Sequence, residues 1–166
     1  MRTDLNTKDR DPPYQLYVAK PLCGDEVYGE AVECVRALVK EERLNQAAAI
    51  CQLNGLLSGG RVEWLYYLAQ IRFKQCLYEQ AHAVLMEALN RQPGYQKARS
   101  QLGLVCIQLK DFEEAIWHLT LAIALDPRDP IPWGRLGICY DDQTGYEEVS
   151  RMVWARSRRL RGVDKD

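Results

Sequence analysis

The side chains that could do chemistry in this chain are six cysteines, two histidines and several adjacent carboxylates. Metal binding and redox chemistry need clustered ligands, and their usual sign in a sequence is a close pair such as Cys-x-x-Cys. The cysteines form no such pair, and no cysteine or acidic residue is adjacent to His82 or His118 in the sequence. We therefore expect both histidines at the surface, and neither a metal site nor a cofactor. The cysteines are Cys23, Cys34, Cys51, Cys76, Cys106 and Cys139.

Among the adjacent carboxylates, the candidate pairs are Glu113-Glu114 and Asp141-Asp142. The first pair opens a predicted helix, where negative charge favours the positive helix end. The second ends a helix beside a turn at Thr144-Gly145, as a solvated loop. The chain has no Gly-rich phosphate loop, no serine nucleophile elbow and no HExxH. We therefore predict that the protein is not an enzyme and has no catalytic residues.

Composition limits the remaining classes. The chain has 166 residues, is 47% hydrophobic and carries a net charge of −1. It is long enough to bury a continuous core, and its charge gives no reason to expect nucleic acid as a partner. No apolar run reaches the length of about 20 residues that spans a bilayer. Most cysteines lie among aliphatic residues, which is typical of small buried side chains in a reducing compartment, so we expect a cytoplasmic protein.

Several residue types recur every 34 positions. Leu68, Leu102 and Leu136 are spaced in this way, and one residue later so are Ala69, Gly103 and Gly137. The same step joins Tyr78 to Phe112 and Tyr146, Ala81 to Ala115, Ala88 to Ala122, and Pro93 to Pro127. A fixed period of this size indicates stacked units that bury their apolar faces only against their neighbours.

These positions resemble the tetratricopeptide repeat (TPR), a helix–turn–helix unit of 34 residues. Three copies fit, at 62–95, 96–129 and 130–163. In the second helix of the third copy, Val149 and Arg156 stand where the family has small alanines. The resemblance implies an all-α, right-handed superhelix of antiparallel helix pairs, with seven to eight helices in all. It also implies that the protein acts by binding another polypeptide.

The segment before the repeats is divided in two. Residues 1–24 are polar and contain prolines, and we expect them to be flexible. Residues 25–61 are expected to form a degenerate capping helix pair, because apolar residues recur at helical spacing within 28–58. In this pair Asn54 occupies the place of the second small alanine. Residues 62–166 hold the three repeats.

In TPR arrays the first helix of each pair faces the concave groove. The resemblance therefore implies a groove that is more apolar than a solvated face needs to be. Such a stripe favours a partner segment with apolar side chains. The predicted groove residues are Tyr66, Gln70, Phe73, Leu104, Ile107, Ile131, Arg135 and Ile138.

Two subfamilies offer more specific comparisons. Some TPR cochaperones clamp a C-terminal carboxylate with Lys, Asn and Arg, but the matching positions hold Tyr66, Gln70, Gln101, Ile131 and Arg135. Only Arg135 has the required charge, which argues against that clamp. The chain is also similar in length and repeat number to the chaperones of bacterial type III secretion translocators. The main prediction is an adaptor or scaffold subunit of a larger complex, and a secretion chaperone is the alternative.

The last predicted helix, 146–161, contains five arginines. Their face could serve as a polar cap for the array. Alternatively, a second copy or another subunit docks there, which makes a homo-oligomeric scaffold the second alternative function. We expect Val153 and Trp154 on the exposed edge, with Trp154 folding back onto its own repeat as the rival arrangement. The interface prediction comprises Met152, Val153, Trp154 and Arg158.

Overall fold

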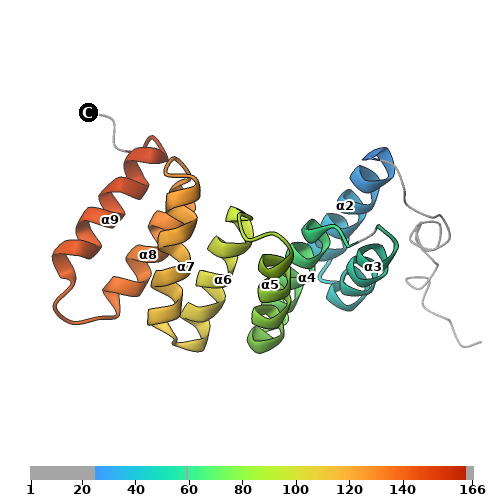
Figure 1. Ribbon diagram of the computed structural model, residues 1–166, viewed down its shortest axis with the longest axis horizontal. Helices are drawn as coiled ribbons and strands as arrows, with labels where there is room; N and C mark the ends of the chain where they lie inside the picture. The colour runs from blue at the N-terminus through green and yellow to red at the C-terminus, as the bar shows by residue number, and fades with distance from the viewer. Residues whose placement is uncertain (1–24, 59, 164–166) are drawn as a thin grey trace, which may run out of the picture. The chain divides into compact units, whose positions relative to one another are not determined.

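The computed structural model describes residues 25–58 and 60–163, and the predicted flexible segment 1–24 lies outside them. The described residues form eight α-helices, which confirms the all-α fold of consecutive helix pairs (Figure 1). They divide into two compact units, one up to Gly60 and one from Arg61 onward. The helices are α2 (Asp25–Lys40), α3 (Leu44–Leu57), α4 (Val62–Lys74), α5 (Tyr78–Arg91), α6 (Gln96–Leu109), α7 (Phe112–Leu125), α8 (Pro130–Asp141) and α9 (Glu147–Leu160).

The first unit is the predicted helix pair, α2 and α3. Its core is apolar, with Val35, Leu38 and Cys51 almost fully buried. Asn54 is also buried, and its Nδ2 donates to the Ile50 carbonyl oxygen at 2.9 Å. This bond within α3 satisfies the amide nitrogen that replaces the expected alanine. Leu56, by contrast, is 82% exposed.

The turn inside the first three helix pairs repeats as regularly as the helices. Glu42, Cys76 and Lys110 follow one another at 34 residues, and all three have left-handed backbones, with φ of 59°, 60° and 66°. After each, the next amide donates at 2.9 Å to a carbonyl five residues back, as in Leu77 to Arg72. This Schellman-type closure ends the first helix and begins the second two residues later.

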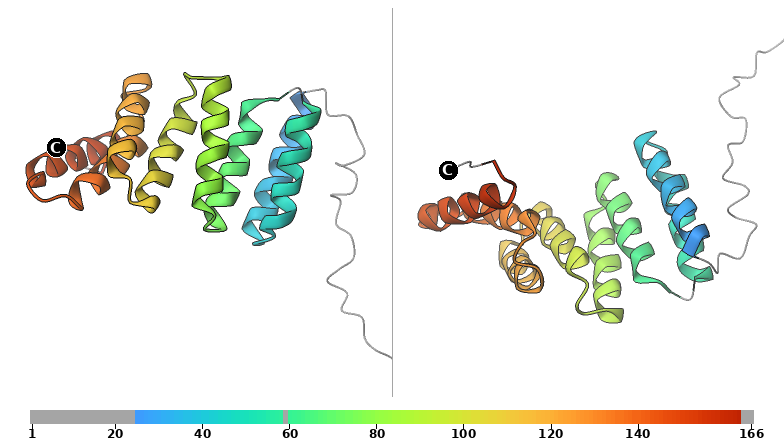
Figure 2. Two further views of the ribbon diagram at one scale, coloured as in Figure 1. Left: turned by 60° about the horizontal axis from the view of Figure 1, so that its bottom comes forward. Right: turned by 90° about the horizontal axis from the view of Figure 1, so that it is seen from above.

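The six helices of the second unit form two layers. Consecutive helices pack as antiparallel neighbours, as Figures 1 and 2 show for α4 to α9. In addition, α4 touches α6 and α6 touches α8, whereas no comparable contact joins α5 to α7 or α7 to α9. The first helices of the three repeats are therefore the more closely spaced layer. Closer spacing on one side is typical of the inner side of a curved array.

The middle repeat packs as its sequence predicts. Ala115, Leu119 and Ala122 on α7 are fully buried. They lie where α7 crosses α6, and a β-carbon at Gly103 would stand only 2.5 Å from Leu119 Cγ. Only glycine leaves room for Leu119 at this crossing.

The third repeat departs from the 34-residue period in its second helix. Val149 and Arg156, at the predicted small positions, are exposed, whereas Ser150 and Ser157 are 4% and 1% exposed. The prediction for α9 was therefore wrong by one residue. The cause is the connection: residues 110–111 join α6 to α7, whereas residues 142–146 join α8 to α9. Gly145, with φ of 91°, follows Lys110 at 35 residues and marks the same shift.

Both serines replace the expected alanines and bond back to α8. Ser150 Oγ donates to Asp141 Oδ1, and Ser157 Oγ donates to the Pro130 carbonyl oxygen at 2.8 Å. A hydroxyl can enter this tight crossing because the preceding helix supplies its acceptor.

Candidate functional site

The predicted groove residues lie on α4, α6 and α8, but they are not equally accessible. Ile131 and Ile138 on α8 are 48% and 38% exposed. Ile107 is buried in the core and is not available to a partner, which corrects its assignment to the groove. The others are half-buried: Tyr66, Gln70, Phe73, Leu104 and Arg135.

Arg135 is the central cation of this face. Its Nη1 donates to Ser100 Oγ at 2.9 Å and its Nη2 donates to Gln101 Oε1 at 3.2 Å. Burial lowers its pKa, and the ionised form of Tyr66 and the charge of Asp129 act in the opposite direction. An arginine nevertheless stays protonated in a protein. Within the described part of the chain, Arg135 forms no ion pair with a carboxylate, and the acceptors of its two hydrogen bonds are neutral.

Tyr66 borders the same face from α4. Its hydroxyl accepts a hydrogen bond from Gln70 Nε2 at 2.8 Å, and its ring meets Tyr95 edge-on at 5.7 Å between centroids. Burial raises the pKa of this phenol, so it stays protonated and keeps a hydrogen to donate at neutral pH. The face thus combines apolar side chains with one cation and one phenol.

The C-terminal edge differs from its prediction. Val153 is buried, and Trp154 folds back onto α8, where its indole would meet a β-carbon at Gly137 at 2.7 Å. Trp154 Nε1 also donates to Asp141 Oδ2 at 2.9 Å. The predicted exposure of Val153 was therefore wrong, whereas the half-buried Trp154 adopts the rival arrangement. Met152 and Arg158 are exposed, and Met152 borders an apolar cleft of about 340 Å³ with Trp133 and Val149.

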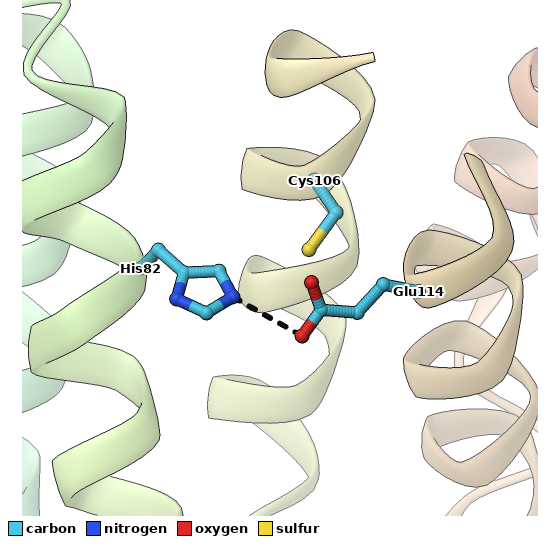
Figure 3. Close-up of side chains that lie close together, drawn as sticks. All are labelled: His82, Cys106 and Glu114. Atoms are coloured by element: carbon cyan, nitrogen blue, oxygen red, sulfur yellow. Dashed lines mark hydrogen bonds and ion pairs between the residues drawn. The ribbon is translucent and has the colours of Figure 1, made fainter. Parts of the chain in front are cut away.

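The structure also contains a cluster that the sequence did not predict, in which side chains of the types that bind metal ions come from three consecutive helices. Ligand atoms of His82 on α5, Cys106 on α6 and Glu114 on α7 all lie within 4.8 Å of one another (Figure 3). The expectation that the spacing offers no clustered ligands is wrong for these residues. His118, expected at the surface, is only 2% exposed, and its Nε2 lies 3.5 Å from Glu114 Oε1.

Two signals could have revealed this cluster. Glu114 and His118 are four residues apart on one helix and therefore share a face. His82 and Glu114 are 32 residues apart, close to one repeat length. Other polar contacts show the same separation, since Gln96 bonds Asp129 and Arg135 bonds Gln101 at 33 and 34 residues. In a stacked array such pairs meet across neighbouring units.

The other sequence expectations concern the cysteines and the membrane. The cysteines of the described region are free, with Cys51, Cys106 and Cys139 buried and Cys76 exposed. Burial raises the pKa of each of the three buried thiols to about 12. None of the described helices has both the length and the apolar character needed to cross a bilayer. The compartment stays a prediction.

Comparison with known proteins places the fold in a class. No protein-family model matches the sequence, and neither does any curated protein sequence. Among solved structures, the fold is that of the TPR proteins, as the sequence predicted. At these identities, all under a quarter, the likeness establishes the fold alone.

Three solved structures illustrate this likeness. A crystal structure of MamA superposes with a TM-score of 0.72 at 17% identity, covering 90% of this chain and 84% of MamA. MamA from Desulfovibrio magneticus RS-1 gives 0.67 at 19% identity, covering 82% and 76%. YrrB, described as a TPR protein with an unusual peptide-binding site, gives 0.63 at 18% identity, covering 78% and 66%.

Proposed function

We propose that the face formed by α4, α6 and α8 binds a segment of a partner polypeptide, and that the chain serves as an adaptor or scaffold subunit. The observation that carries the proposal is Arg135, a half-buried cation with neutral partners between the exposed side chains of Ile131 and Ile138. A guanidinium without a carboxylate in ion-pair contact favours one from a partner, in a bidentate pair. The flanking isoleucines favour apolar partner side chains.

The partner segment therefore carries an acidic side chain or a terminal carboxylate with apolar residues beside it. Leu104 and Phe73 extend the apolar surface from α8 toward α4, and Tyr66 supplies a hydroxyl donor. The description of YrrB as a peptide-binding TPR protein supports a peptide as the ligand of this fold. The proposal involves no catalytic step and no cofactor.

A displayed library of random peptides, selected on the full chain, tests this function. We expect enriched peptides to place a carboxylate among apolar residues. Ile131→Asp and Ile138→Asp together should abolish their binding, and Arg135→Gln should weaken it by about tenfold or more, since a charge-assisted bond is lost.

The matched control is Leu125→Asp, because Leu125 on α7 is as exposed as Ile131, at 48% each, but lies in the other layer. This variant should bind the selected peptides as the wild type does. If the double variant at Ile131 and Ile138 bound the selected peptides as well as the wild type does, the proposal would be contradicted.

A homo-oligomeric scaffold is the second candidate, and one observation favours it. Met152 is 68% exposed beside the apolar cleft on α9. Burial of such a side chain contributes about 1.5–3 kcal/mol to an interface. Sedimentation over a wide concentration range, with Met152→Ser as the comparison, tests it. A wild type that is monomeric throughout would rule this candidate out. The likeness to secretion chaperones stays a prediction.

A further inference from the structure

The cluster on α5, α6 and α7 has a chemistry that peptide binding does not use. It brings together an imidazole, a thiol and a carboxylate, which are the three side-chain types that bind Zn²⁺ most often. His82 Nε2 lies 3.1 Å from Glu114 Oε1, and Cys106 lies beside the same carboxylate (Figure 3). We propose that His82, Cys106 and Glu114 form a binding site for a divalent transition metal ion, Zn²⁺ being the natural occupant.

The distances suit a metal ion of this size. Ligand atoms around tetrahedral Zn²⁺, bound at about 2.0–2.3 Å, stand about 3.3–3.8 Å apart. The three ligand atoms already lie within 4.8 Å of one another. Side-chain rotations that bring these atoms about 1 Å closer together are enough to close the site. The helices themselves need not move.

The surroundings supply an entrance and fix the inner ligands. The side chains of His82 and Glu114 are 28% and 34% exposed, so solvent reaches the site, whereas Cys106 is fully buried. Three protein ligands leave a fourth position for water. Asp111 caps α7 by accepting from the Glu114 amide at 3.0 Å, which fixes the start of the helix that carries the carboxylate.

His118 serves as a positioning residue. Burial lowers its pKa, which the charge of Glu114 only partly offsets, so the ring is neutral at pH 7 and has one N–H to donate. Its Nε2 lies 3.5 Å from Glu114 Oε1, the same oxygen that faces His82. Outer partners of this kind orient a ligating carboxylate.

Charge balance favours the bound state. Burial and the neighbouring charge of Glu114 raise the pKa of the Cys106 thiol to about 12, so this thiol is protonated in the metal-free protein. Metal binding forms the S–metal bond and releases that proton to solvent. One thiolate and one carboxylate then neutralise the ion's two charges, with His82 neutral. The other charged groups acting on the cluster are Asp111, near Cys106, and Arg99, near His118.

The test uses the full chain, stripped of metal by a chelator and kept with a non-thiol reductant. Titration with Co²⁺ should produce a thiolate-to-cobalt charge-transfer band at one equivalent, and Zn²⁺ should displace it. Affinity should rise about tenfold from about pH 7 to about pH 8, because one proton is released. Absence of a thiolate band would overturn the proposal.

Variants assign the ligands. Cys106→Ser should remove the band, and His82→Ala and Glu114→Gln should each lower the affinity by at least about tenfold. His82 and Glu114 are partly exposed, so their substitution should not prevent folding. If Cys106→Ser fails to fold, these two variants test the ligand assignment. His118→Gln should keep the band and weaken binding less than either ligand change.

Two matched controls complete the experiment. Cys139 is equally buried, with a thiol pKa also raised to about 12, and Cys76 is exposed. Cys139→Ser and Cys76→Ser should both bind Co²⁺ like the wild type. A band lost in either control but kept in Cys106→Ser would overturn the assignment.

Discussion

The junction of α5, α6 and α7 and the junction of α7, α8 and α9 have the same backbone arrangement but different side-chain chemistry. At the first, a polar cluster joins three helices through His82, Cys106 and Glu114. The equivalent positions at the second, 34 residues on in α7 and α8 and 35 on in α9, hold Ile116, Tyr140 and Val149. The repeat thus specifies the packing of the helices and leaves these positions free to vary.

The crossings within the two repeats differ in the same way. Leu119 covers Gly103 in the middle repeat, whereas Trp154 covers Gly137 in the third. Alanines line the first crossing, and hydrogen-bonded serines line the second. The same kind of helix crossing therefore accepts either apolar or partly polar side chains. The condition is that these side chains are small and that their polar atoms form hydrogen bonds.

The largest effect is expected at the tighter crossing. Gly103→Leu inserts four carbon atoms where Leu119 Cγ would already stand 2.5 Å from a β-carbon. We expect the free energy of unfolding to fall by about 3 kcal/mol, the upper end for overpacking. Urea denaturation followed by circular dichroism measures it. Gly94→Leu, with nothing within 4 Å of its β-carbon, should change stability by less than about 0.5 kcal/mol. Equal stability of the two variants would contradict the packing described for the middle repeat.

A smaller effect tests the shifted third repeat. Ser157→Leu overpacks a position that is 1% exposed and removes the bond to Pro130, so unfolding should become easier by about 2 kcal/mol. Arg156→Leu changes an exposed neighbour and should stay within about 0.5 kcal/mol. An unbroken 34-residue period predicts the reverse order, so the same denaturation assay discriminates between the two.

A smaller effect is a pH dependence near neutrality, which His118 at the first junction should cause and which is measured with a chelator present. Burial lowers the pKa of His118, so the unfolded chain binds a proton more readily than the folded one. Stability is then fully present above about pH 6.5 and falls as the pH drops below that value. His118→Gln should flatten this part of the profile. An unchanged slope in the variant would show that His118 is not the responsible group.

Glu114 should act in a lower pH window. Partial burial acts to raise its pKa, but the hydrogen bond and charge of His82, with smaller contributions from Cys106 and His118, leave the pKa below its usual value. Its contribution is therefore present above about pH 4.5 and is lost as the pH falls below that value. Glu114→Gln should reduce the loss of stability in acid, and urea titrations at a series of pH values measure it.

Much of the architecture could be predicted because it depends on spacing alone. The period placed α4 to α7 correctly, and helical recurrence within 28–58 predicted the pair α2 and α3. The one-residue shift of α9 could not be predicted by carrying the period forward, because Tyr146, at the end of the longer connection, keeps the 34-residue spacing from Phe112 and hides the insertion. Ser150 and Ser157 are small, like the alanines they replace, but their spacing only becomes informative once Val149 and Arg156 are known to be exposed.

The site residues were harder to predict, for a different reason. Helical periodicity separates a buried face from an exposed one, but Ile107 lies at the border between them, and a phase error of a few tens of degrees moves it into the core. The ligand cluster depends on contacts between repeats, which motif spacings within one segment do not describe. Polar pairs separated by about one repeat length are the signal that such arrays provide.

The arginines of α9 limit how copies of this protein can assemble end to end. Ile116 and Ile123 on α7 help to pack the core, and their equivalents 35 residues on are Arg151 and Arg158, both exposed. A repeat stacked on α9 as α8 stacks on α7 would have to desolvate two guanidinium groups, which costs several kcal/mol unless each finds an acidic partner. Head-to-tail contacts that do not close into a ring grow into filaments. Two positive charges on one helix thus disfavour fibre growth while leaving the cleft beside Met152 open to a symmetric contact.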